Sequence, residues 1–291
     1  MRTLSIAAIQ TAAIHGDLDA TWTRFEAQVR KVVEIRAHVD LIVVPELLLA
    51  APGPLLVDDP EFDERAATAI PGPVTDRICG LARELGVWLV PGSLVERGDD
   101  DRLYNTAIAV SPEGDIVARY RKLFPWRPYE ELTPGRDFTT FDIPGVGTVG
   151  LAICFDGSFP EVARQLAWLG AEVIIQPTLT TTRDREMEVV MSRANAFANQ
   201  VYVVNVNGAA PSGVGESVFV DPEGTILQRA SGGDEVLFAV LDLDRVTQVR
   251  EYGTFGLNRP WAQLADQCAL VEYPMFGGAK FVAPAWAEPM E

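Results

Sequence analysis

Short apolar runs of strand length alternate along the chain with longer amphipathic segments. The continuously hydrophobic runs, typical of strands buried on both faces, lie at 3–10, 40–46, 87–93, 147–154, 172–177 and 201–207. Between them apolar residues recur at helical spacing. The predicted helices include Trp22, Phe25, Val29 and Val32 in one segment and Ile78, Leu81 and Leu85 in another, with two more at about 160–169 and 185–199.

Two segments have the turn chemistry of β-hairpins. Residues 105–120 read NTAIAV-SPEGD-IVARY and residues 217–230 read SVFV-DPEGT-ILQRA, with Pro and Gly in each turn. Hairpins add antiparallel pairs to strands that otherwise alternate with helices. The sequence therefore predicts an α/β protein with mixed sheets and helices on their outer faces.

The chain shows no linker rich in Pro, Gly or Ser that would divide it. We predict one domain over residues 1–249 and a tail over 250–291 of different character, in which aromatic residues lie among Pro and Gly without a clear period. The tail either packs over the core of its own chain or forms a subunit contact.

Composition excludes several classes of function. A formal net charge of -17 over 291 residues repels nucleic acid and anionic membranes, and the start of the chain indicates a first strand instead of a signal peptide. Three scattered cysteines and two histidines give neither a disulfide framework nor a metal-binding pattern. We expect a cytoplasmic protein that uses no metal and no other cofactor.

Cys154 ends an apolar run and precedes Asp156 and a helix-like segment, which raises the question of what would activate its thiol. Cysteine nucleophiles usually take help from a histidine, but this chain has only His15, in an early loop, and His38, at the end of the first helix. The remaining bases are carboxylates. Cys79 and Cys268 lie in a helical stripe and in the tail, where we expect inert thiols.

Glu46 and Lys122 also lie at the ends of predicted strands. Glu46 stands between LIVVP and LLLA, where desolvation favours the protonated form of a carboxyl and suits it to general-base chemistry. Lys122 follows IVARYR and precedes the rigid LFPWRP segment. Each also has a structural interpretation: a strand-end Glu can cap a helix, and a strand-end Lys is usually solvated.

Taken together and in this order, Glu46, Lys122 and Cys154 resemble the nitrilase (carbon–nitrogen hydrolase) superfamily. The resemblance rests on VVPELLL, YRKLFPW and LAICFDGSFPEVAR around these residues and extends to about residue 244. It is most similar to the aliphatic amidase and formamidase branch, because Gly157 follows the cysteine by three residues and KLFPWRPYE places Glu130 eight residues after the lysine.

This resemblance implies a four-layer αββα sandwich, a homodimer or higher homo-oligomer, and hydrolysis of non-peptide C–N bonds. Cys154 would be the nucleophile, Glu46 the general base and acid, and Lys122 the stabiliser of the transition state. The backbone N–H of Phe155 would be a second oxyanion donor, and Glu130 would position the substrate.

The residues around these positions suggest a pocket. Trp126 and Tyr129 are candidate walls, as is the TLTTT run that begins at Thr178. Asp156 and Glu161 belong to a helix entry that starts at Pro160, where acidic residues are expected for structural reasons alone.

The substrate is less well specified than the reaction. Superfamily members that bind acidic substrates often have an Arg four residues after the cysteine, where this chain has Ser158, and nitrilases usually have Trp where it has Phe155. The pattern therefore favours water and a small carboxamide as substrates, although Arg127 could recognise an acidic or polar group. The alternatives are a hydrolase of N-carbamoyl, ureido or omega-amide substrates, a nitrilase, and a non-catalytic αββα binding or assembly protein.

Overall fold

Two large β-sheets form the centre of the molecule. The computed structural model describes residues 1–53, 62–268 and 270–287. In the first sheet the strand order is β13-β1-β2-β3-β5-β4, and β6 pairs with β5. Its strands are β1 (Thr3–Gln10), β2 (Leu41–Val43), β3 (Trp88–Val90), β4 (Ser93–Arg97), β5 (Leu103–Val110), β6 (Ile116–Arg121) and β13 (Glu235–Asp242).

The second sheet has the strand order β12-β11-β10-β9-β8-β7. Its strands are β7 (Thr139–Ile143), β8 (Gly147–Leu151), β9 (Val173–Thr178), β10 (Tyr202–Asn207), β11 (Val218–Val220) and β12 (Ile226–Arg229). In the first sheet β2 pairs in parallel with β1 and with β3, and in the second sheet β9 pairs in parallel with β8 and with β10. The outer pairs of both sheets are antiparallel. The predicted mixed sheets are thus present.

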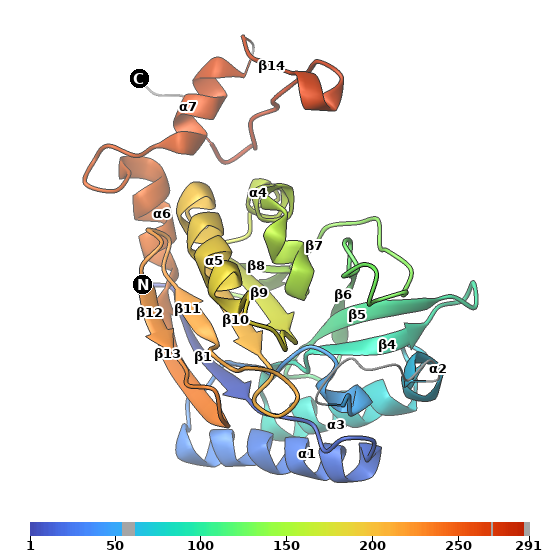
Figure 1. Cartoon of the computed structure of the whole chain (residues 1–291). Helices are drawn as coiled ribbons and strands as arrows, with labels where there is room; N and C mark the ends of the chain where they lie inside the picture. The colour runs from blue at the N-terminus through green and yellow to red at the C-terminus, as the bar shows by residue number, and fades with distance from the viewer. Residues whose placement is uncertain (54–61, 269, 288–291) are drawn as a thin grey trace.

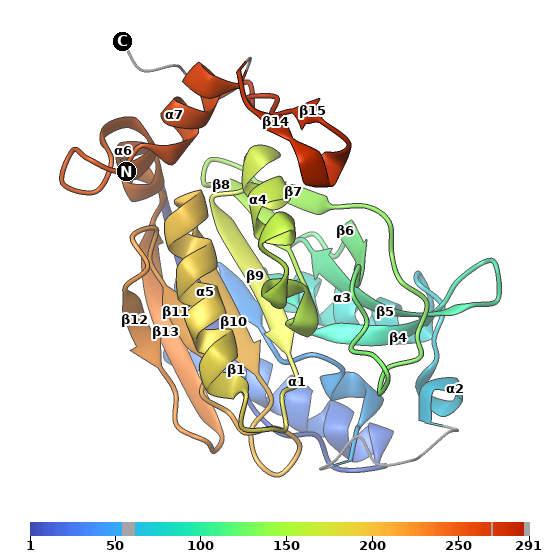
Figure 2. The same cartoon turned by 45° about the horizontal axis from the view of Figure 1, so that its top comes forward.

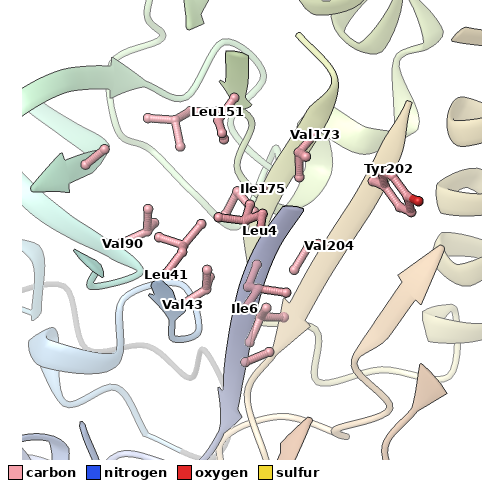
Figure 3. Close-up of a cluster of buried hydrophobic side chains, with 14 of the residues drawn as sticks. Leu4, Ile6, Leu41, Val43, Val90, Leu151, Val173, Ile175, Tyr202 and Val204 are labelled. Carbon is pink, nitrogen blue, oxygen red and sulfur yellow. The ribbon is translucent and has the colours of Figure 1, made fainter. Parts of the chain in front are cut away.

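The main core lies between the two sheets. Leu4 and Ile6 of β1 meet Val173 and Ile175 of β9 in this layer (Figure 3). Residues of β1 with odd numbers point the other way, and Ile9 packs with the helices. Because side chains alternate along a strand, one apolar strand supplies both layers, which explains why these runs are hydrophobic throughout.

Helices cover the outer face of each sheet. Figure 1 shows α1 (Leu18–Ile35) and α3 (Pro73–Leu85) on one side of the molecule and α4 (Pro160–Trp168) and α5 (Arg185–Asn199) on the other. Their buried stripes, which include Phe25 and Ile78 on one side and Leu166 and Ala196 on the other, join two separate apolar clusters. The layers are therefore helix, sheet, sheet, helix, and the predicted αββα class is confirmed.

Both predicted hairpins form. β5 pairs with β6 and β11 with β12, and the turn glycines Gly114 and Gly224 have φ values of 81° and 80°, which other residues rarely adopt. The short helix α2 (Phe62–Ala66) and the strands β4, β7 and β13 are additions to the predicted elements. The predicted strand at 87–93 is interrupted at Pro91 and Gly92, where β3 ends and β4 begins.

The C-terminal segment packs on α4 and α5 of its own chain. It contains α6 (Leu243–Tyr252), α7 (Pro260–Gln267), β14 (Glu272–Tyr273) and β15 (Ala279–Lys280), and Figure 2 shows the last three together beyond the ends of α4 and α5. Trp261 is buried there, and its indole donates to the carbonyl of Asn199 at 3.0 Å. The boundary suggested by the sequence, between 249 and 250, falls inside α6.

None of the helices in the described ranges combines the length and the apolar composition that crossing a membrane would require.

Candidate active site

Cys154 begins a short 3-10 helix (Cys154–Ser158) that connects β8 to α4. Its φ of 47° lies in the left-handed region, which costs a non-glycine residue on the order of 1–3 kcal/mol. Two side chains hold this turn in place. The amide of Gln176, on β9, donates to the carbonyl of Cys154 at 2.8 Å, and Asp156 accepts from the N–H of Ile153 at 2.9 Å.

Asp156 is completely buried and serves the same turn. Its carboxylate accepts from the hydroxyl of Tyr120 at 2.7 Å and from the N–H of Phe124 at 2.9 Å. Burial raises the pKa of Asp156 to about 6, although the charge of Lys122 and the three hydrogen bonds act in the opposite direction. These contacts agree with the structural role predicted for Asp156, because they attach the cysteine turn to β6.

Glu46 follows β2 at a sharp change in backbone direction. Leu47 has a φ of 53°, and its N–H donates to the hydroxyl of Ser93 at 3.1 Å. Gly92 approaches so closely that a Cβ there would lie 1.8 Å from the carbonyl oxygen of Pro45. The turn between β3 and β4 therefore fixes the backbone that carries Glu46, whose side chain is buried.

Lys122 connects the two acidic candidates. It follows β6, its backbone N–H donates to the carbonyl of Asn105 at 2.8 Å, and its side chain is 2% exposed. Its ammonium lies 2.9 Å from Oε1 of Glu46 and 2.7 Å from Oε2 of Glu130. The solvated lysine that the structural interpretation assumed is thus replaced by a buried one between two carboxylates.

Asn105, near the start of β5, is a fourth member of this cluster that sequence reasoning missed. Its Nδ2 donates to Oε1 of Glu46 at 2.8 Å and to Oε1 of Glu130 at 2.9 Å. Glu130 also accepts from the backbone N–H of Trp126 at 2.8 Å. An asparagine in an otherwise apolar strand was the available signal, since a buried amide needs polar partners.

The positive charge of Lys122 and the negative charge of Glu130 stabilise each other's ionised form. Burial lowers the pKa of Lys122, but the negative charges of Glu46 and Glu130 outweigh it and hold this pKa well above its usual range, and Cys154 acts in the same direction once its thiol ionises. Burial raises the pKa of Glu130, yet the adjacent ammonium and the hydrogen bonds bring it below its ordinary value. At neutral pH the lysine is therefore cationic and Glu130 is ionised.

The thiol of Cys154 lies within the electrostatic reach of this cluster. Burial and the charge of Glu46 raise its pKa well above the usual value, while Lys122 lowers it. At rest the sulfur is thus a neutral thiol with a carboxylate nearby. This arrangement suits a nucleophile that loses its proton as it attacks, and not a preformed thiolate.

A cavity of about 100 Å³ opens onto Cys154 from the side of α5. Its walls include Trp126, Phe155, Thr180, Glu188 and Met191. Pockets for drug-sized ligands are usually about 300–1,000 Å³, so this one suits a small molecule. Trp126 and Phe155 are the two predicted pocket residues that the structure places in its wall.

The other predicted pocket residues lie elsewhere. Tyr129 is 66% exposed and stacks at a tilt on Trp126, with 4.7 Å between ring centroids. Arg127 donates to the carbonyls of Glu130 and Leu132 at 2.7 and 3.0 Å, so it braces its own loop. Thr178 is fully buried at the end of β9 and donates to the carbonyl of Gln176. None of the three is among the described residues that line the cavity.

Sequence reasoning also missed Glu188, which faces the cavity from α5. Asn195, on the same helix, donates to the carbonyl of Gly157 at 2.8 Å and steadies the turn after the cysteine. Both occur at helical spacing within a predicted amphipathic helix, where polar positions are normally solvated, so the sequence held no signal for them.

Among the described residues, no group of three or more His, Cys, Asp and Glu side chains has the arrangement of a metal site.

Comparison with known proteins places the chain in a family. The family model for carbon-nitrogen hydrolases matches residues 5–251. A formamidase of Bacillus cereus (strain Q1) is 35% identical over 219 residues, which are 67% of this chain and 66% of the relative. Formamidases of Bacillus thuringiensis (strain Al Hakam) and others match at 33% over the same shares. The matching region thus spans just under two thirds of these relatives.

Solved structures show the same fold. Saccharomyces cerevisiae Nit3, a member of branch 10 of the nitrilase superfamily, superposes with a TM-score of 0.77 at 26% identity, over 86% of this chain and 94% of Nit3. An amidase from Nesterenkonia sp. superposes with a TM-score of 0.72 at 24% identity, over 85% of this chain and 94% of the amidase. With its sequence match from β1 to α6 and this shared fold, the chain belongs to the carbon–nitrogen hydrolase family.

Proposed function

We propose that this protein is an amidase that hydrolyses a small carboxamide to the acid and ammonia through a thioester on Cys154. The observation that carries the proposal is the buried Lys122 ammonium between Glu46 and Glu130, beside a thiol that opens onto a small cavity. A non-catalytic protein would gain little from three buried charges, because desolvation opposes each of them.

In the first half of the reaction the sulfur of Cys154 attacks the amide carbon. The thiol proton passes to Glu46, and the carbonyl electrons move to the oxygen. Lys122 and Asn105 both bind Oε1 of Glu46, so we assign the proton transfer to Oε2. When the tetrahedral intermediate collapses, Glu46 gives this proton to the nitrogen, the C–N bond breaks, and ammonia leaves.

In the second half water cleaves the thioester. Glu46, again a carboxylate, takes a proton from the water as its oxygen attacks the acyl carbon. The C–S bond then breaks, the sulfur regains a proton, and the acid leaves. Lys122 and the backbone N–H of Phe155 would stabilise the oxyanion in both halves, and one such donor is typically worth about 100- to 1,000-fold in rate.

Glu130 would hold the substrate's amide nitrogen next to the reacting centre. Its pKa lies below the ordinary value, so it stays an acceptor at neutral pH while Glu46 carries protons. The cavity supports a neutral substrate, because none of the described residues that line it is basic and Arg127 is engaged with its own loop. The name formamidase carried by the relatives agrees with a small amide.

The test is ammonia release from formamide, short aliphatic amides, omega-amides, N-carbamoyl amino acids and nitriles. We expect release from the small neutral amides. Cys154→Ala should lower it by at least about 1,000-fold, since without the sulfur no thioester forms. Cys79→Ala is the matched control, because Cys79 lies on α3 away from the cluster, and it should keep the wild-type rate.

Two results would contradict the proposal. Turnover by Cys154→Ala at the wild-type rate would remove the nucleophile from the mechanism. Release confined to carbamoyl substrates, carboxylate-bearing amides or nitriles would keep the mechanism and replace the substrate class. Circular dichroism of the variant distinguishes a lost nucleophile from a lost fold.

A further inference from the structure

Glu188 presents a carboxylate to the cavity that contains Cys154. It lies in the first turn of α5 and its side chain is 17% exposed. Both of its oxygens are 2.7 Å from the hydroxyl of Thr180, which also lines the cavity. That hydroxyl has one proton to donate, so the carboxylate keeps acceptor capacity toward the cavity.

Arg185 fixes this carboxylate and compensates its charge. Its Nη1 donates to Oε2 of Glu188 at 2.8 Å, and its remaining bonds go to Oδ1 of Asn205 and the carbonyl of Glu216, both at 3.0 Å. The guanidinium is buried, so it is rigidly held. Glu188 is therefore a stationary acceptor that needs no substrate cation to neutralise it.

The remaining walls of the cavity limit what can lie against Glu188. Trp126, Leu179 and Met191 are apolar, and Asp184 adds a second carboxylate. None of the described lining residues is basic, so an anionic group in the cavity would meet two carboxylates and no basic side chain, because Arg185 lies behind Glu188. Cys154 and Glu188 line the same cavity, and the charge of Glu188 contributes to raising the pKa of the thiol.

We infer that Glu188 and Thr180 form an acceptor subsite for a hydroxyl or amino group on the carbon next to the scissile carboxamide. The inference rests on the proposed amidase function and narrows it to small carboxamides that carry a second hydrogen-bond donor. Carboxylate-bearing amides are rejected at the same place. A hydrogen bond to a charged acceptor should give such substrates an advantage of about tenfold or more in kcat/KM.

The experiment uses three amides of the same size, which are propionamide, glycolamide and glycinamide, together with malonamate as the anion. Ammonia release by the wild-type protein gives kcat/KM for each. We expect glycolamide, glycinamide or both to exceed propionamide about tenfold, and malonamate to react least. A lead for glycinamide assigns the subsite to amines, and a lead for glycolamide assigns it to hydroxyls.

Glu188→Gln tests whether this preference comes from the subsite. Arg185 and Thr180 donate to the side chain, so they would hold the glutamine oxygen and turn its NH2 group toward the cavity. The acceptor then becomes a donor. The kcat/KM for glycolamide or glycinamide, divided by the kcat/KM for propionamide, should therefore fall about tenfold. Glu186→Gln makes the same charge change on α5 at a side chain that pairs with Arg229 outside the cavity, and should leave the ratio unchanged.

The ratio compares two substrates in one preparation, so the fraction of folded protein cancels. The subsite would be overturned if propionamide were hydrolysed as fast as glycolamide and glycinamide or faster, and if Glu188→Gln did not change the ratio. The proposed amidase function would not be affected by that result. No hydrolysis of any amide, with an inert Cys154, would overturn both.

A second measurement needs no variant. Iodoacetamide should alkylate Cys154 faster than iodoacetate does, because Glu188 and Asp184 repel the anion. The ratio of these two alkylation rates should be at least about tenfold larger at Cys154 than at Cys79 in the same protein. Equal preferences at the two cysteines would contradict the rejection of anions.

Discussion

At the scale of single residues, the positive charge of Lys122 acts on two groups, the neighbouring carboxylates and the thiol of Cys154. Its ammonium lies between the carboxylates of Glu46 and Glu130 and lowers the pKa of Glu130, and it interacts electrostatically with Cys154, where negative charge would develop in the proposed reaction. Two carboxylates and one ammonium leave the cluster with a net negative charge, which disfavours a thiolate. In the proposed mechanism the thiolate would therefore be generated only when substrate and Glu46 act together.

This balance of charges predicts opposite effects of Glu46→Gln on two observables. Amide hydrolysis should fall by at least about 100-fold, because the base is lost. The pKa of Cys154 should fall as well, because the charge of Glu46 raises it and that of Lys122 lowers it. The pKa is measured from thiolate absorbance against pH in a protein whose other cysteines, Cys79 and Cys268, are replaced by Ser.

Lys122→Met is the complementary variant in that titration. It removes the charge that lowers the pKa of the thiol, so the pKa should rise further above its usual value. A thiol pKa that does not move in either variant would mean that the cluster and the sulfur do not interact, and that Glu46 is not its base.

At the scale of elements, each catalytic candidate lies just beyond the end of a strand, and a neighbouring element fixes its backbone. For Glu46 that element is the turn between β3 and β4. Gly92 has a φ of 77° and lies against the carbonyl of Pro45. Only a residue without a Cβ fits there, so this glycine allows the backbone just before Glu46 to lie in its observed position.

Gly92→Ala should therefore damage both stability and activity. The added methyl group would have to displace the backbone at Pro45, and we expect a loss of at least about 2 kcal/mol in the free energy of unfolding and a lower kcat. Gly80→Ala is the matched control, because Gly80 is an exposed position in α3 with no heavy atom within 4 Å of the new Cβ. It should raise stability by about 0.5–1 kcal/mol.

Urea denaturation followed by circular dichroism gives the stabilities, and ammonia release gives kcat. A Gly92→Ala protein as stable and active as the wild type would show that the turn can move without disturbing Glu46.

The sequence and the family resemblance predicted most of the elements that carry the candidate site, and the structure brings the predicted Glu130 together with Glu46 and Lys122. Glu46, Lys122 and Cys154 follow predicted strands, and strand ends are where side chains leave the sheet. Asn105 could not be assigned in the same way, because its partners are 59 and 25 positions away and only the pairing of strands brings them to it. Thr178 was assigned to the cavity from its place in TLTTT, but β9 continues through it and buries it, and the next residues form the wall.

At the scale of the whole molecule, the candidate site exists only where the two sheets meet. Glu46 follows β2 and Lys122 follows β6 in one sheet, while Cys154 follows β8 in the other. The cavity wall adds residues from α5, in the outermost layer (Figure 2). Both sheets and the helical layer that contains α5 must therefore assemble before the proposed site is complete.

The outer face of α5 carries apolar side chains that its own chain leaves exposed. Met187, Val190 and Phe197 are 61%, 51% and 44% exposed. Met187 also lines the cavity, so whatever covers this face lies beside the opening to Cys154. Exposed apolar stripes of this kind are typical of protein interfaces, and the homodimer or higher oligomer expected from the family resemblance would cover it with a second copy.

We therefore predict that the protein is at least a dimer and that Val190→Glu weakens the assembly. A buried, unpaired carboxylate at an interface between copies should increase the dissociation constant by about 100-fold or more, because its desolvation has no compensation.

Val240→Glu is the control, since Val240 is a similarly exposed valine, at 58%, on β13 in the other half of the sandwich. Light scattering after size exclusion, over a range of concentrations, measures the mass of each. A monomeric wild type, or equal dissociation of both variants, would place the interface elsewhere, and unchanged activity in a monomeric Val190→Glu would show that the cavity does not depend on it.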